Sequence, residues 1–223
     1  MKKYIGLLIV ALLLMACQTV TQTPATVKME VHVLKANHQE LLVYHQGQGL
    51  IRLNSKLEYV PGDVLEIEFS GEILDSYPAQ IGEVINIKKG TKDEHEILLY
   101  YKLIDDFIHQ DFALASNIEE VSINIPDLEI GKDALYFLLR DLLEVENVFE
   151  VASFEALIAT GKLETEYGGY EYRNGVYLEI KKNSDQQFKA YMFRSGLGAI
   201  WFRYEVQKVQ GVYQLNGIME AIS

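Results

Sequence analysis

The period of the hydrophobic pattern changes near Gly90 in this chain of 223 residues. Before that point, apolar and polar residues alternate in short runs such as Val27–Val33, a pattern typical of half-buried strands. After it, apolar residues recur at helical spacing, first over Lys92–Asp111. The sequence therefore predicts an α+β protein with a β domain over residues 27–90 and an α+β domain over residues 91–223.

The β domain contains several short strands that Gly- and Pro-rich turns separate, and Pro61-Gly62-Asp63 is the clearest of these turns. This arrangement predicts a small, twisted β-barrel.

The second domain is expected to begin with helices and short strands and to end in an antiparallel meander from Tyr170 onward. Ser153 is the expected N-cap of its third helix. Asn174-Gly175 is the best hairpin signal in the chain, and it is predicted to join strands at Tyr170–Tyr172 and Val176–Ile180.

The chain has 20 Lys and Arg against 32 Asp and Glu, for a formal charge of −12. The net charge is −3 over residues 28–90, −14 over residues 91–171 and +3 over residues 172–223. An acidic chain without a basic block is unsuited to binding nucleic acid through its phosphates. About half of the residues are apolar, which is enough for a packed core.

The single cysteine of the chain, Cys17, excludes intramolecular disulfides and zinc sites built from several thiolates. It follows Lys2 and Lys3, an apolar stretch and Ala16, an order that resembles a lipoprotein signal peptide. The resemblance implies cleavage between Ala16 and Cys17 and lipidation of Cys17. An ordinary signal peptide with a chance cysteine is the alternative.

The predicted location is therefore the extracytoplasmic face of the cell membrane, where a lipid anchor holds the protein. Residues 1–16 are then the signal peptide, and the polar residues 17–26 are a flexible tether.

Two segments resemble known lipoproteins. Residues 27–89 resemble the small OB-like domain of YobA-like (DUF3221-like) bacterial lipoproteins, through Pro61-Gly62-Asp63 and the pentapeptide Ser76-Tyr77-Pro78-Ala79-Gln80. This resemblance implies an OB-like barrel and carries no activity, although the strand near Leu50–Leu53 is short for that pattern. Phe193–Ala199 is similar to C-terminal domains of uncharacterised Firmicute lipoproteins.

The best arrangement for catalysis is Asp105, Asp106 and His109. On a helix, Asp105 and His109 are i, i+4 neighbours, and a carboxylate that orients an imidazole can form a general base or a metal ligand. No second histidine cluster completes such a site, so a solvated polar face is the alternative.

Other chemistry is less well supported by the sequence. Asp127, Glu129, Gly131 and Asp133 imitate the start of a calcium loop, but its twelfth position is Leu138 instead of the bidentate Glu that the loop requires. We expect no metal site and no cofactor.

Aromatic residues crowd the C-terminal region, with arginines among them. Strand alternation places Trp201, Arg203 and Glu205 on one face and Phe202, Tyr204 and Val206 on the other. One face is expected to pack on the helices, and the other is a candidate binding surface. The candidate residues are Tyr170, Tyr172, Tyr191, Arg194, Trp201 and Arg203. The alternative is that aromatic residues simply suit a half-exposed sheet.

Three functions remain open at this point. The leading hypothesis is a non-catalytic binding or accessory module of the cell envelope, with a cell-wall glycan, a peptide or an envelope protein as its partner. The second is an envelope hydrolase that acts on cell-wall material through Asp105, Asp106 and His109. The third is a docking subunit or an inhibitor of a membrane complex.

Overall fold

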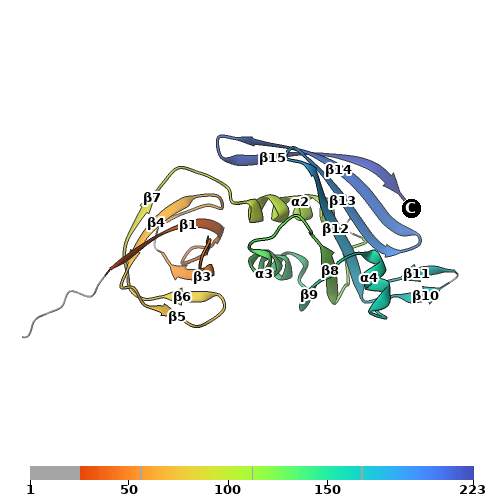
Figure 1. Ribbon diagram of the computed structural model, residues 1–223, viewed down its shortest axis with the longest axis horizontal. Coiled ribbons are helices and arrows are strands. Elements are labelled where there is room, and N and C mark those ends of the chain that lie inside the picture. The colour runs from red at the N-terminus through yellow and green to blue at the C-terminus, as the bar shows by residue number, and fades with distance from the viewer. Residues whose placement is uncertain (1–25, 56, 112, 167) are drawn as a thin grey trace, which may run out of the picture.

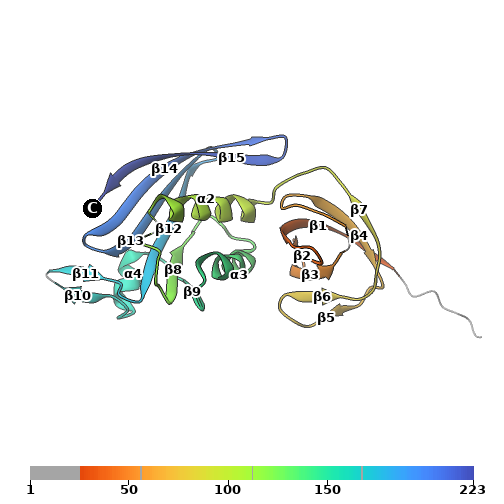
Figure 2. The same cartoon turned by 180° about the vertical axis from the view of Figure 1, so that it is seen from behind.

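The computed structural model describes residues 26–223, apart from residues 56, 112 and 167. The strands form two mixed sheets, and helices α2 (Glu96–Gln110) and α3 (Lys132–Leu143) lie between them (Figures 1 and 2). The α+β prediction is confirmed at this level. Among the described residues, no helix is both long enough and apolar enough to cross a membrane. The predicted signal peptide and the anchor residues Ala16 and Cys17 lie outside the described residues.

The first sheet contains seven strands in the order β5-β6-β3-β2-β1-β4-β7. Their bounds are β1 (Val27–Ala36), β2 (Glu40–His45), β3 (Gly49–Asn54), β4 (Val64–Phe69), β5 (Ile73–Leu74), β6 (Ala79–Ile81) and β7 (Val84–Lys89). The sheet curves around its own apolar core, which includes the fully buried side chains of Val31, Val43, Ile51 and Ile67. Alternation along the strands places these residues on one face.

The predicted small barrel is not closed in the described part of the chain, because no ladder joins the two ends of the first sheet. β6 pairs with β3 at one end and β7 pairs with β4 at the other, although the two strands are separated only by Gly82 and Glu83. The backbone of this short turn is bonded elsewhere: Gly82 N–H donates to Glu72 O at 2.8 Å, and Glu83 O accepts from Ser70 N–H at 3.0 Å.

The outer face of the first sheet is also apolar where the helices meet it. Leu34, Leu42, Tyr44 and Leu50 belong to the same buried cluster as α2, α3 and the second sheet. Helix α2 is buried on several sides, since the four consecutive residues Ile97–Tyr100 are all at most 4% exposed. The two sheets thus share one apolar layer through the helices. The division into two domains near Gly90 stays a prediction.

The second sheet is built from the C-terminal half of the chain. Its strands are β8 (Glu120–Asn124), β9 (Asn147–Glu150), β10 (Glu164–Glu166), β11 (Gly169–Glu171), β12 (Gly175–Ser184), β13 (Gln187–Ser195), β14 (Gly198–Val209) and β15 (Val212–Ile222). β8 pairs in parallel with β9 and β12, while β12 to β15 pair antiparallel in chain order, as the meander prediction required. Helix α4 (Phe154–Ala159) begins at the predicted N-cap Ser153, whose hydroxyl accepts from Ala156 N–H.

The predicted hairpin at Asn174-Gly175 is wrong, because β11 pairs with β10 and β13 and makes no ladder with β12. Tyr172 decides this path: its N–H donates to Arg194 O of β13 at 2.6 Å. Its ring also lies against Gly175, where a Cβ would be only 2.6 Å from the ring. The chain therefore crosses from one side of β13 to the other, where β12 pairs with both β13 and β8.

We predict that Leu50→Ala destabilises the whole protein, because Leu50 is 1% exposed and lies where the first sheet meets the helices. The free energy of unfolding should fall by about 2–5 kcal/mol, measured by urea denaturation. Leu57→Ala is the matched control, since Leu57 is 61% exposed, and it should change the value by less than about 0.5 kcal/mol. Equal effects of the two variants would contradict the shared apolar layer.

Candidate functional site

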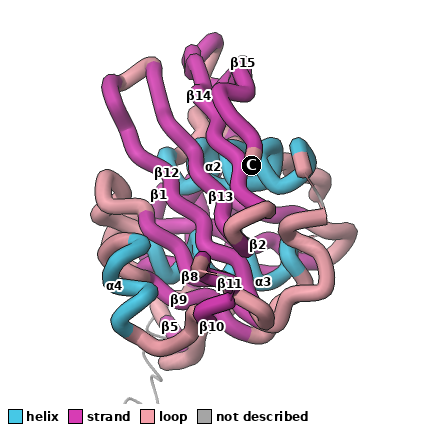
Figure 3. Tube along the Cα trace, turned by 90° about the vertical axis from the view of Figure 1, so that its right-hand side faces the viewer, coloured by secondary structure: helices cyan, strands magenta, loops and turns pink. Residues whose placement is uncertain are grey.

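Strand alternation divides the side chains of the second sheet between two faces. Phe202, Tyr204 and Val206 of β14 point toward the helices and join the main buried cluster, as predicted. Trp201 and Arg203 point to the opposite side, together with Tyr191 of β13. We call the side chains of Tyr191, Trp201, Arg203 and Lys189 the aromatic face. Figure 3 shows the long strands of this sheet from the side of the molecule that carries α4 and the β10–β11 hairpin.

The centre of the aromatic face is a pair of stacked rings. Tyr191 and Trp201 are direct partners across β13 and β14, and their ring centroids are 4.8 Å apart with an interplanar angle of 25°. Tyr191 also contacts Phe154 of α4 and Tyr177 of β12 edge to face. Trp201 lies at the open end of this row and is 36% exposed. Helix α4 therefore covers one end of the row and leaves the indole ring accessible.

Charged groups border the stacked pair in the next register row. Lys189 lies directly opposite Arg203 on β14 and Lys181 on β12. Arg203 is paired with Glu205 at 3.2 Å and with Glu220 at 3.3 Å. The stacked rings are therefore bordered on one side by charged groups of both signs, which offer hydrogen-bond donors and acceptors without a strong net charge.

The six candidate surface residues separate into two groups. Tyr191, Trp201 and Arg203 lie together on the aromatic face, and Tyr170 is 39% exposed beside Phe154. Tyr172 and Arg194 do not belong to an exposed binding surface. Arg194 donates to the carbonyl oxygens of Leu114 and Ser116, so its guanidinium fastens the loop after α2.

Tyr172 is a structural residue, because its side chain is 1% exposed. Its hydroxyl donates to Glu120 at 2.6 Å and lies 2.9 Å from the Ser122 hydroxyl. Burial, and after it the hydrogen bond to Glu120, raise the pKa of Tyr172. The hydroxyl stays protonated and holds the polar groups of β8 beneath α4.

The predicted catalytic residues lie on the surface of α2. The side chains of His109 and Asp105 are 63% and 44% exposed, and His109 Nδ1 lies 3.4 Å from Asp105 Oδ1. The Asp106 carboxylate already accepts a hydrogen bond from the Tyr204 hydroxyl at 2.7 Å. His109 and Asp105 are therefore exposed on the helix, whereas Asp106 is turned toward a buried tyrosine, and the three do not act as one set. Among the described residues, no group of three or more His, Cys, Asp or Glu side chains is placed to hold a metal ion.

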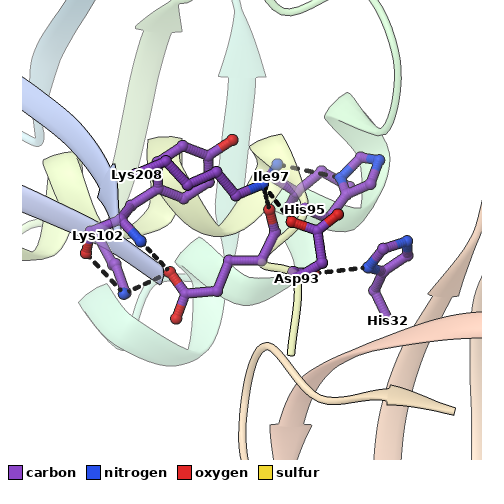
Figure 4. A network of polar contacts seen from close by, with 8 residues as sticks. His32, Asp93, His95, Ile97, Lys102 and Lys208 are labelled. Carbon is purple, nitrogen blue, oxygen red and sulfur yellow. Dashed lines mark hydrogen bonds and ion pairs between the residues drawn. The ribbon is translucent and has the colours of Figure 1, made fainter. Parts of the chain in front are cut away.

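The sequence missed a junction at Asp93, Glu94 and His95, where both sheets meet the start of α2 (Figure 4). The predicted helix over Lys92–Asp111 begins later, at Glu96, because His95 is its N-cap: the ring nitrogen Nδ1 accepts from Ile97 N–H at 3.2 Å. Asp93 and Glu94 therefore precede the helix instead of occupying its first turn.

Glu94 is 3% exposed and joins α2 to the β14–β15 hairpin. Its carboxylate accepts from Lys102 Nζ at 2.7 Å and from Tyr213 N–H at 2.9 Å, and its own N–H donates to Gly211 O at 2.8 Å. Gly211 has a φ of +77°, and a Cβ there would lie 2.0 Å from Lys92 O. Only glycine allows the hairpin to approach this closely.

Asp93 joins the same junction to the first sheet. Its N–H donates to Gly62 O at 3.1 Å, and its carbonyl oxygen accepts from His32 Nδ1 of β1 at 3.0 Å. Its carboxylate is paired with Lys208 of β14 at 2.6 Å. Hydrophobic periodicity does not reveal Asp93, Glu94 and His95 as a junction. The only sequence signal among their partners is the turn Pro61-Gly62-Asp63, which contains Gly62.

Searches against protein-family models, curated proteins and solved structures found no match to this chain. The likeness to YobA-like lipoproteins therefore stays a prediction.

We predict that His95 makes the stability of the protein depend on pH. Burial, and then the neighbouring His32 and Lys208, lower the pKa of His95 to about 4. In the unfolded chain a histidine has a pKa of about 6.5, so below that pH the unfolded state takes up the proton first. The stabilising contribution is complete above about pH 6.5 and is lost as the pH falls to about 4. The loss should reach about 3 kcal/mol.

The measurement is urea denaturation at several pH values between 7 and 4. His95→Asn keeps an N-cap acceptor and removes the titration, so its stability should decline less steeply over this range. His38→Asn serves as the control, because His38 is exposed. The idea fails if His95→Asn follows the same pH profile as the unchanged chain.

Proposed function

We propose that this protein is a lipid-anchored binding module of the cell envelope, and that the aromatic face of its second sheet contacts a cell-wall glycan. The observation that carries the proposal is the stacked pair of Tyr191 and Trp201, with the indole 36% exposed on an open sheet. Tryptophan, tyrosine and arginine dominate the binding energy of recognition surfaces, and all three occur together here.

The surroundings of the rings favour a glycan as the ligand. The flat indole can lie against the apolar C–H groups of a sugar ring, while the ion pairs of Arg203 offer donors and acceptors to its hydroxyl groups. The balanced charges do not require a charged ligand. A peptide or an envelope protein would use the same rings, and the experiment below separates these partners.

The hydrolase alternative loses its support, because Asp105 and His109 are exposed and Asp106 is bonded to Tyr204. A binding or accessory role needs no set of catalytic residues. It depends only on the accessible aromatic rings.

We also propose that the first sheet is a partly open relative of the OB-type barrel. β1, β2 and β3 form a meander, β4 pairs with β1, and the segment that carries β6 and β7 contacts both β3 and β4. OB-type barrels are themselves only partly closed. The pairing pattern supports the relation without a closed hydrogen-bonded ring.

We predict that Trp201→Ala lowers the affinity for soluble peptidoglycan fragments about tenfold or more, because a central aromatic contact is lost. Trp201 is the single tryptophan of the chain, so its fluorescence reports directly on the aromatic face. Titration of the unchanged protein with the fragments should shift that fluorescence and saturate. The affinity of the variant is measured by calorimetry, since it has no tryptophan.

Tyr77→Ala is the matched control, because Tyr77 is an aromatic residue that is 59% exposed outside the second sheet. Its affinity should equal that of the unchanged protein. If peptides shift the tryptophan fluorescence and glycan fragments do not, the glycan assignment is overturned. Equal affinities of the Trp201 and Tyr77 variants would overturn the assigned face.

The anchor is a separate part of the proposal. It rests on the sequence order of Lys2, Lys3, the apolar stretch, Ala16 and Cys17.

We predict that Cys17→Ser blocks processing of the precursor or releases the protein from the membrane fraction, because serine lacks the thiol that lipidation needs. Cell fractionation and the apparent mass of the precursor test this. Membrane association that equals that of the unchanged chain, with normal processing, would refute the anchor.

A further inference from the structure

In the described part of the chain, one long edge of the second sheet has no partner strand. β15 is 11 residues long and pairs only with β14. At the start of its outer side, Tyr213 N–H and the Tyr213 carbonyl oxygen are bonded to Glu94 and Lys102, and from Leu215 onward the described residues offer the outward backbone groups no partner. From Asn216 to Ile222 every residue of the strand is exposed. Free backbone donors and acceptors in this arrangement are a template for another strand.

The other edges of both sheets are short or charged. The edge strands β5, β10 and β9 have two, three and four residues, and β7 has six and ends in Lys88 and Lys89. Short length and lysine are two ways in which proteins prevent edge pairing. β15 has neither protection, because it contains no lysine or proline and its single charged residue is Glu220.

Apolar side chains add to the accessible backbone at the same edge. Ile218, Met219 and Ile222 are 38%, 49% and 63% exposed. Glu220 is already paired with Arg203 at 3.3 Å, so the edge presents little free charge.

We propose that β15 pairs antiparallel with β15 of a second copy of this chain, about a two-fold axis near Gly217. This register places the exposed Met219 against Leu215 of the other copy, and the ladder spans Leu215–Met219 because the outer side of Tyr213 is already bonded to Glu94 and Lys102. Each contact occurs twice, as a two-fold axis requires. The strand is thus complementary to itself.

Charge also favours a second copy at this edge and not elsewhere. The whole chain carries −12, so two copies repel each other over most of their surface. Residues 172–223, which include the edge, have a net charge of +3. Repulsion is therefore lowest where the two strands meet.

The dimer has a consequence for the geometry of the sheet. A two-fold axis perpendicular to the strands joins two sheets edge to edge and keeps both copies of Trp201 on the same side. Two identical aromatic faces would then act together on one extended ligand. Self-pairing itself does not depend on the identity of that ligand.

The test uses the full chain in mild detergent. Sedimentation velocity over a range of protein concentrations should show twice the monomer mass. Hydrogen exchange of the β15 amides should slow as the concentration rises. Ile218→Lys places two lysines diagonally across the axis, and Met219→Lys places a charge against the apolar Leu215 of the other copy. Each variant should raise the dimer dissociation constant at least about tenfold. Leu197→Lys is the matched control, since Leu197 is 92% exposed in the β13–β14 turn, away from the edge.

Three results would overturn the proposal. The first is a monomer at every concentration. The second is a dimer whose dissociation constant is the same for both β15 variants and the Leu197 variant, because the interface would then lie elsewhere. The third is concentration-dependent exchange in another strand while the β15 amides stay unprotected. Circular dichroism that matches the unchanged chain shows that the variants are folded.

Discussion

The layer formed by α2 and α3 must be apolar on two sides, and the rest of the structure depends on this constraint. The helices cover one face of the second sheet and also receive Leu42, Tyr44 and Leu50 from the outer face of the first. A helix on the surface of a protein buries one stripe, whereas α2 buries four residues in succession, Ile97–Tyr100. The first sheet consequently buries its inner face on its own core and, around β2 and β3, part of its outer face on this layer. Its position relative to the second sheet follows from that burial.

Polar contacts then determine how the layers are aligned. Apolar packing has no strong direction, whereas the hydrogen bonds of Asp93 and Glu94 have defined partners in both sheets. Glu94 is buried with its charge compensated by Lys102, an arrangement that becomes costly if one partner is removed. The same short segment carries His95, whose low pKa makes the alignment sensitive to acid.

Local signals predicted those parts that local physics controls. The alternation of β14 correctly separated Trp201 from Phe202, because side chains on a strand alternate whatever lies around it. Ser153 was correctly identified as an N-cap, since capping depends on residues within one turn. The hairpin at Asn174-Gly175 failed because the partner of a strand is chosen by distant residues, here the contact of Tyr172 with β13.

The sequence by itself determined the mixture of strands and helices, the two faces of the C-terminal strands and the predicted anchor at Cys17. These depend on periodicity and on short motifs, which act over a few neighbouring residues. Only the tertiary structure decided that Tyr172 is buried, that Tyr191 stacks on Trp201, that the helices are shared by two sheets, and that β15 is left as an unprotected edge. Each of those features depends on which distant segments share a surface. That choice is made by the burial of apolar area over the whole chain, and no local pattern encodes it.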